Sequence, residues 1–139
     1  MIEVVRRLDK SVRNNFNTEG LSHLYWELFD SPDSNGSGFM YMEREPVLIL
    51  DDIIKEHQKY RPVIERGYTS KPIADLLGLP SISPYRVGKG VKLRVTSAPK
   101  RMFIVKALIL RGVERIAINE KYIEFDTDNY LYKPNLYLR

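Results

Sequence analysis

Apolar side chains in the middle of the chain recur at helical spacing. In residues 46–60 they lie three and four positions apart, Pro46 suits a first helical turn, and Pro62 prevents continuation. Residues 70–79 show a shorter version of the same pattern, and Gly78 is suited to end that helix. Both segments are therefore predicted to be helices.

Two further segments carry helical signals. Residues 97–112 begin with Ser97, a good N-cap, and end with Gly112, which favours a helix C-terminus. Residues 3–13 place apolar side chains three and four apart, which predicts a short amphipathic helix. We expect this second segment to act as a docking arm.

Strand-like patterns separate the predicted helices. Residues 90–97 alternate apolar and polar side chains, as in a half-buried strand, and residues 61–68 also favour a strand. Residues 114–118 and 122–128 flank a short polar turn and predict a hairpin. The order of elements predicts an α+β fold with a small, mainly antiparallel sheet and helices packed largely on one face.

An aromatic cluster precedes a segment rich in turn-forming residues. Tyr25, Trp26 and Phe29 are followed by nine residues, 30–38, of Asp, Ser, Pro, Asn and Gly, which predict a long ordered turn. The cluster is interpreted as part of a small core, and a ligand platform is the alternative.

Composition limits the chemistry. The 139 residues contain no Cys, which excludes thiolate nucleophiles and sulfur-ligated metals, and only two His, His23 and His57. The net charge of +4 is spread among acidic neighbours, so a mixed solvated surface is expected and a nucleic-acid partner is not. No apolar run is long enough to span a membrane, and the first residues do not resemble a secretory signal.

The length fits one compact domain. We predict an N-terminal arm over residues 1–20 and a single domain over residues 21–139.

Several stretches resemble the zinc D-alanyl-D-alanine carboxypeptidases, in particular the small phage-encoded peptidases and endolysins of the Hedgehog/DD-peptidase fold. Residues 24–38 resemble the family's aromatic-acidic opening and its turn, and residues 63–83 resemble its Ser-Gly-Tyr-Arg segment, its His-Asn pair and its Gly-Gly turn. The metal loop, Ser-x-His-x-x-Gly-x-Ala-x-Asp, falls on residues 83–92, and the last strand, Phe-Ile-His-x-Asp, on residues 122–126. The resemblance covers about five-sixths of the chain.

The positions that hold zinc in the family have changed. The resemblance places the three ligands at Tyr85, Lys92 and Glu124, and the substrate-binding arginine at Thr69. A lysine ammonium in a zinc site would repel the metal. The resemblance therefore implies a pseudoenzyme, with no catalytic residue, metal or cofactor.

Three uses of the former metal site are open. Tyr85, Lys92 and Glu124 either fill the vacated space, which we favour, or form a new binding pocket. The third alternative is a relocated metal site made of Glu124, Asp126 and Asp128, which alternate along the predicted strand.

The resemblance implies an inactive carboxypeptidase-like domain of phage origin that serves as a structural or binding component, made in the host cytoplasm and incorporated in the virion. Its expected partner is a protein, another copy of itself or another virion protein; binding to peptidoglycan stays open, and no membrane partner is expected. One alternative is a murein peptidase with an altered site. The other is a soluble effector that binds a host protein or small ligand in the former active-site cleft.

The C-terminal tail is the second predicted binding region. Its aromatic and cationic side chains are of the kinds that dominate protein interfaces. The alternative is that the tail packs on the chain's own sheet. The proposed partner-binding residues are Tyr130, Tyr132, Tyr137 and Arg139.

Overall fold

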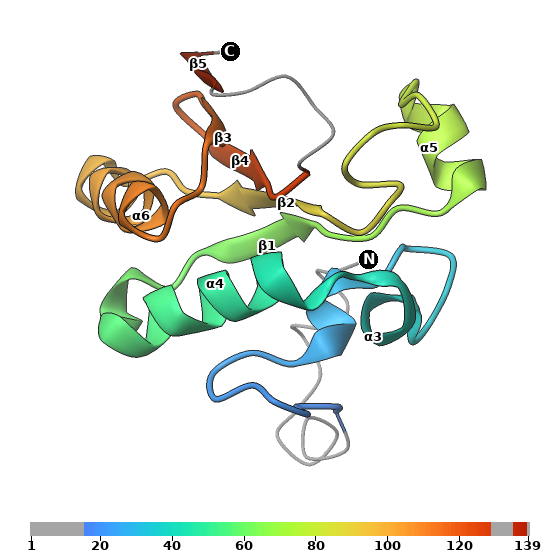
Figure 1. The fold of residues 1–139 in the computed structure, drawn as a ribbon, viewed down its shortest axis with the longest axis horizontal. Helices are drawn as coiled ribbons and strands as arrows, with labels where there is room; N and C mark the ends of the chain where they lie inside the picture. Colours follow the sequence, from blue (N-terminus) through green and yellow to red (C-terminus); the bar gives the residue numbers. More distant parts are fainter. Residues whose placement is uncertain (1–15, 129–134, 139) are drawn as a thin grey trace.

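A five-stranded sheet forms the centre of the structure, a computed structural model that describes residues 16–128 and 135–138 (Figure 1). The first four strands pair antiparallel, and the last pairs parallel to its neighbour. The predicted α+β fold with a mainly antiparallel sheet is confirmed. In spatial order the strands are β1 (Val63–Arg66), β2 (Gly90–Arg94), β4 (Tyr122–Asp126), β3 (Arg115–Ile118) and β5 (Asn135–Leu138).

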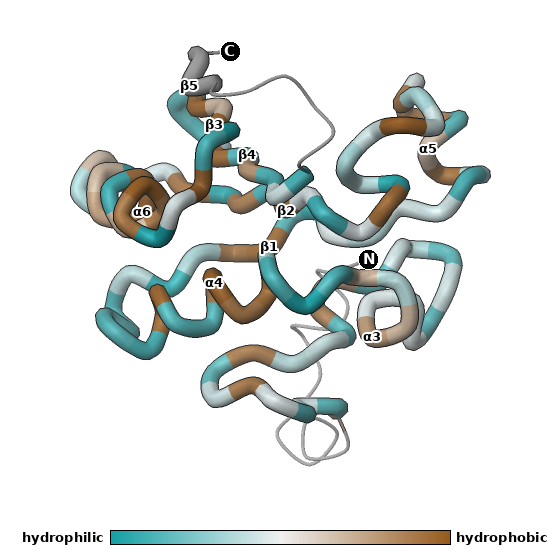
Figure 2. Tube along the Cα trace, viewed as in Figure 1, coloured by the Kyte–Doolittle hydropathy of each residue, from teal (hydrophilic) through white to brown (hydrophobic). Residues whose placement is uncertain are grey.

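Two long helices cover one face of this sheet. They are α4 (Arg44–Glu56), predicted from its apolar spacing, and α6 (Ala98–Leu110), predicted from the residues at its two ends. The apolar side of α4 faces the sheet and its polar side faces outward (Figure 2). The Ser97 hydroxyl caps α6 by accepting from the N–H of Lys100 at 3.4 Å.

The core lies between these helices and alternate residues of the strands. Each fully buried aliphatic side chain stabilises the fold by about 1.5–3 kcal/mol. The central members of the core are Leu50, Ile53, Val91, Leu93, Ile104, Leu108, Ile123 and Phe125. The aromatic cluster Tyr25, Trp26 and Phe29 belongs to this same core, as interpreted from the sequence.

The segment before α4 is more helical than predicted. A 3-10 helix, η1, spans Trp26–Phe29, where the sequence predicted an aromatic cluster without a regular element. A short helix, α3, spans Ser37–Tyr41 and begins inside the predicted turn of residues 30–38. Gly36 adopts φ of 84° immediately before α3, and the Asp30 carboxylate accepts from the N–H groups of Gly36 and Gly38. The side chain of Asp30 thus anchors the first backbone donors of this helix.

Two shorter helices complete the fold. The helix η2 (Gln58–Tyr60) follows α4, and α5 (Lys71–Leu77) lies at the opposite end of the molecule from α6 (Figure 1). Gly78 ends α5 in the left-handed conformation, as predicted. Among the described residues, no helix is long and apolar enough to cross a membrane.

The end of the chain joins its own sheet. Strand β5 pairs with β3, and Tyr137 lies in β5. This arrangement corresponds to the alternative in which the tail packs on the chain's own sheet. The other tail residues proposed for partner binding, Tyr130, Tyr132 and Arg139, lie outside the described residues.

The predicted helix over residues 3–13 also lies outside the described residues. Residues 16–20, the end of the predicted arm, pack against the domain. The indole N–H of Trp26 donates to the carbonyl of Glu19 at 2.8 Å, and the ring of Phe16 stacks on Tyr25.

Candidate functional site

A hollow of about 270 Å³ opens on the face of the sheet opposite the core. Residues of β1, β2, β3 and β4 form its floor, and five residues of the loop after α5 form its wall, namely Leu79, Pro80, Ser83, Pro84 and Tyr85. We call it the sheet pocket. Side chains alternate between the two faces of a strand, so the sequence neighbours of the pocket's polar side chains on β2 and β4 lie in the core; these neighbours are Val91, Leu93, Ile123 and Phe125.

The sheet pocket brings together the three positions at which the resemblance places the zinc ligands. Lys92 on β2 and Glu124 on β4 are register partners, and Tyr85 reaches them from the loop. The hydroxyl of Tyr85 donates a hydrogen bond to Oε1 of Glu124. Tyr85 is buried although it is a polar aromatic residue, so its ring fills space above the strands.

The loop that carries Tyr85 is fixed by its backbone. Gly88 has φ of 74°, and a Cβ atom there would lie 2.0 Å from the carbonyl oxygen of Tyr41. Its own carbonyl accepts from the N–H of Glu43 at 2.8 Å. Closer to Tyr85, the carbonyl of Pro84 accepts from the N–H groups of Lys89 and Gly90. Only glycine fits at position 88 without displacing the loop.

Two cations lie on adjacent strands of the pocket floor. Arg66 on β1 is the register partner of Lys92 on β2. The guanidinium of Arg66 lies 5.0 Å from the ring centre of Tyr85, and Nζ of Lys92 lies 4.3 Å from the ring centre of Tyr122. With the part of the chain that the structure describes, neither cation forms an ion pair.

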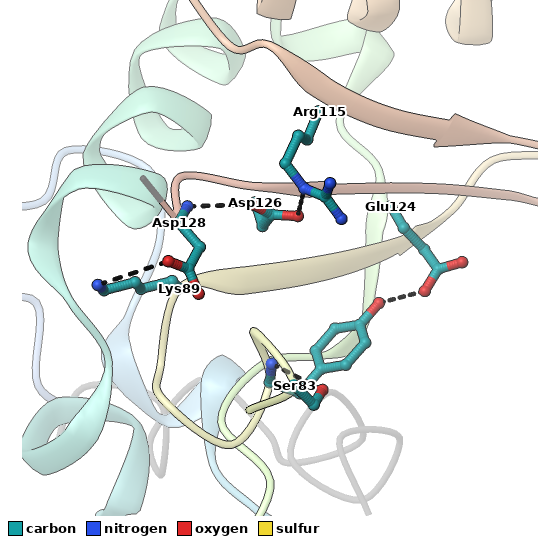
Figure 3. Close-up of polar contacts among 7 residues, drawn as sticks. Ser83, Lys89, Arg115, Glu124, Asp126 and Asp128 are labelled. Carbon is teal, nitrogen blue, oxygen red and sulfur yellow. Dashed lines mark hydrogen bonds and ion pairs between the residues drawn. The ribbon is translucent and has the colours of Figure 1, made fainter. Parts of the chain in front are cut away.

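The acidic residues at the far side of the pocket have partners of their own (Figure 3). Nε of Arg115 donates to Oδ2 of Asp126 at 3.0 Å. Asp128 lies beyond the end of β4, its carboxylate 4.0 Å from Nζ of Lys89, and its N–H donates to Asp126. Both aspartates are buried, so these contacts compensate their desolvation.

The alternative of a relocated metal site is wrong in this geometry. Glu124 binds Tyr85, Asp126 binds Arg115, and Asp128 faces Lys89, so the three carboxylates do not converge. Within residues 16–128, no three His, Asp or Glu side chains are grouped to hold a metal ion.

The histidines lie elsewhere. His57 falls within the predicted helix over residues 46–60, but it follows the C-terminus of α4 and packs against the rings of Tyr60 and Phe103. The backbone N–H of His23 donates to the buried carboxylate of Asp51. Neither histidine lines the sheet pocket.

Thr69, the position of the family's substrate-binding arginine, is buried and does not line the pocket. Its N–H donates to the carbonyl of Tyr85 at 3.0 Å, and its own carbonyl accepts from Arg86. Thr69 therefore connects the segment after β1 to the loop that carries Tyr85.

The turn before α3 forms hydrogen bonds with Ser70, the residue that follows Thr69. The hydroxyl of Ser70 donates to the Asp33 carboxylate at 2.7 Å, and its N–H donates to the hydroxyl of Ser31. The hydrogen bonds from Ser70 and then Ser31 hold the pKa of Asp33 below its ordinary value. The pKa of Asp30 shifts in the opposite direction. Burial raises it, and this effect outweighs the hydrogen bonds from the N–H groups of Gly36 and Gly38, which lower it.

Sequence reasoning missed Arg66 and Arg115. The predicted hairpin contained the signal for Arg115, because its register sets Arg115 opposite Asp126. Arg66 gave no signal of its own, since its role depends on a register shift between Ile64 and Arg66.

No protein-family model matches the chain, and no curated protein or solved structure matches it. The resemblance to the carboxypeptidases stays a prediction from motif positions.

Proposed function

We propose that this domain is a degenerate relative of the phage-type zinc DD-carboxypeptidases and that it binds a partner or ligand without hydrolysing peptides. The observation that carries the proposal is the meeting of Tyr85, Lys92 and Glu124. They come from a loop and two strands, and they line one pocket.

The chemistry of these side chains supports binding over hydrolysis. A catalytic zinc needs three ligands with available lone pairs and an open position for water. Here Lys92 contributes a positive charge, and the carboxylate of Glu124 is engaged by the hydroxyl of Tyr85. Such a donor set does not fit zinc, and without a metal nothing in the pocket would lower the pKa of an attacking water to about 7.

A structural or binding role in a phage particle is the role we propose for the domain. The resemblance to phage-encoded peptidases supports this part of the proposal. A protein partner, either another virion protein or a second copy of the chain, fits a domain that has lost its chemistry.

Metal analysis of the purified full-length protein tests the proposal. We expect zinc well below stoichiometry after exposure to excess metal and desalting, and no release of D-alanine from muramyl pentapeptide. About one zinc per chain, a stoichiometry that a site of nanomolar affinity would retain, would contradict the proposal.

A designed variant tests the alignment itself. The triple change Tyr85→His, Lys92→Asp and Glu124→His should create a zinc site, because the three positions already lie in one pocket. The matched control keeps Lys92 and changes the other two, and it should bind zinc more weakly. A folded triple variant that takes up no zinc would show that the alignment is wrong.

A further inference from the structure

The floor of the sheet pocket contains a like-charge pair. Arg66 and Lys92 are directly opposite each other on adjacent antiparallel strands, and both line the pocket. Like charges placed opposite each other on a sheet face destabilise it. Both side chains are half-buried, which weakens the screening of their repulsion by water.

The protein compensates other charges around this pair. Asp126 is held by Arg115, and on the same strand as Lys92 the exposed Arg94 pairs with Glu65 at 3.2 Å. The guanidinium of Arg66 and the ammonium of Lys92 contact aromatic rings. Glu124 lies opposite Lys92 on the next strand, but its carboxylate binds the Tyr85 hydroxyl, and among the described residues it forms no ion pair with Lys92. The lining residues together carry three cations and two carboxylates. The pocket therefore has an excess of positive charge.

The wall of the pocket is mainly apolar. Leu79, Pro80 and Pro84 line it next to the ring of Tyr85. The volume of the sheet pocket, about 270 Å³, lies just below the range of pockets that bind drug-sized molecules. The half-open space suits a ligand with a charged head and a small apolar body.

We propose that the sheet pocket binds a small organic anion, whose carboxylate or phosphate group bridges Arg66 and Lys92 and whose apolar part packs against Pro80, Pro84 and the ring of Tyr85. The planar guanidinium of Arg66 offers paired donors, and Lys92 offers a mobile ammonium. Binding would draw the ammonium from the ring of Tyr122 toward the anion. The proposal rests on the proposed function, because it assigns a ligand class to the same non-catalytic pocket.

Anion titrations of the full-length protein test this proposal. The probes are inorganic phosphate, acetate and benzoate, followed by calorimetry and by amide NMR shifts, in EDTA at constant ionic strength. We expect at least one probe to bind with a dissociation constant of about 1 mM, and benzoate to bind more tightly than acetate because its ring contacts the apolar wall. Tightest binding of phosphate would indicate a phosphate ligand, and tightest binding of benzoate a carboxylate.

Single substitutions distinguish the site from general charge attraction. Lys92→Met and Arg66→Met should each weaken binding about tenfold, as expected for a desolvated charge contact. Arg94→Met removes one charge from the same strand outside the pocket and should leave affinity within about twofold. If wild-type protein binds no probe at 10-fold the expected constant, or if all three variants weaken binding equally, the proposal is wrong.

Stability gives an independent measure. Relief of the repulsion should raise the urea midpoint of Lys92→Met although the variant binds anions less well, and a purely structural lysine would lower it. Lys92→Gln is the second variant if Lys92→Met does not fold. If the wild-type protein binds neither anions nor zinc, this inference alone is overturned. If the protein holds stoichiometric zinc and EDTA abolishes its anion binding, the proposed function is overturned.

Discussion

The two faces of β2 and β4 differ in what their side chains do. On the core face, Leu93 and Ile123 are fully buried and pack against the helices. On the pocket face, their sequence neighbours Lys92 and Glu124 make polar and aromatic contacts around a hollow. Because strand side chains alternate between faces, one face can keep the fold while the other changes its chemistry. The proposed loss of catalysis would require such a separation.

The largest expected loss of stability comes from a substitution on the core face. Leu93→Ala should lower the free energy of unfolding by about 2–5 kcal/mol, because it leaves a cavity among the residues under the helices. The adjacent Arg94→Ala, on the other face, should lower the free energy of unfolding far less, since it removes only an exposed ion pair with Glu65. Urea unfolding of both variants measures the difference. Equal losses would show that the two faces are not independent.

A smaller effect is expected in the loop that forms the pocket wall. Gly88→Ala should destabilise the protein by about 1–3 kcal/mol, because the residue combines positive φ with a close approach to the Tyr41 carbonyl. Gly112→Ala is the matched control. Its φ is also positive, at 83°, but no atom lies within 4 Å of the added Cβ, so only the conformational cost of about 1 kcal/mol remains.

If both glycine variants lost equal stability, the contact between the loop and α3 would contribute nothing. Anion binding would then not depend on a pocket wall that this contact holds in place. A loss confined to Gly88→Ala would instead connect the shape of the sheet pocket to this contact.

The smallest expected effect is a pH dependence in the turn that supports the pocket. The folded-state pKa of Asp33 is lowered by Ser70 and Ser31, so its stabilising contribution is present above the unfolded value of 3.8 and is lost as the pH falls through the folded value. Asp30 has a raised pKa, so its ionised form costs stability, and that cost disappears as the pH falls.

The variant Asp33→Asn separates the opposite effects of Asp33 and Asp30 on how stability depends on pH. The stability difference between wild type and this variant should be largest near neutral pH and should shrink below about pH 4, as urea midpoints at several pH values would show. A difference that stays constant down to about pH 2 would mean that the hydrogen bonds from Ser70 and Ser31 do not depend on the charge of Asp33.

Local patterns predicted the elements whose cause is local. The helix that holds Pro46 in its first turn, the cap at Ser97 and the hairpin of β3 and β4 follow from spacing and turn chemistry. Three elements, η1, α3 and β5, escaped prediction, and for the last two the stabilising partners lie outside the element itself. Helix α3 depends on the Asp30 carboxylate, and β5 depends on parallel pairing with β3.

The site was predictable only in part for the same reason. Tyr85, Lys92 and Glu124 were found through the motif positions of a resembling family. The pairing of Arg66 with Lys92 depends on a shifted strand register, which leaves no pattern in a short strand. The like-charge register pair that leads to the anion proposal was therefore visible only in three dimensions.

The attachments of the Tyr85 loop have a consequence for kinetics. Backbone bonds fix it at Thr69, at the Pro84 carbonyl and at Glu43, so the wall of the pocket is already in place before a ligand arrives. Entry and exit would then need no opening step, and association should be a single second-order process without a slow phase. A weak ligand would exchange rapidly on the NMR timescale, with its residence time set by its own contacts.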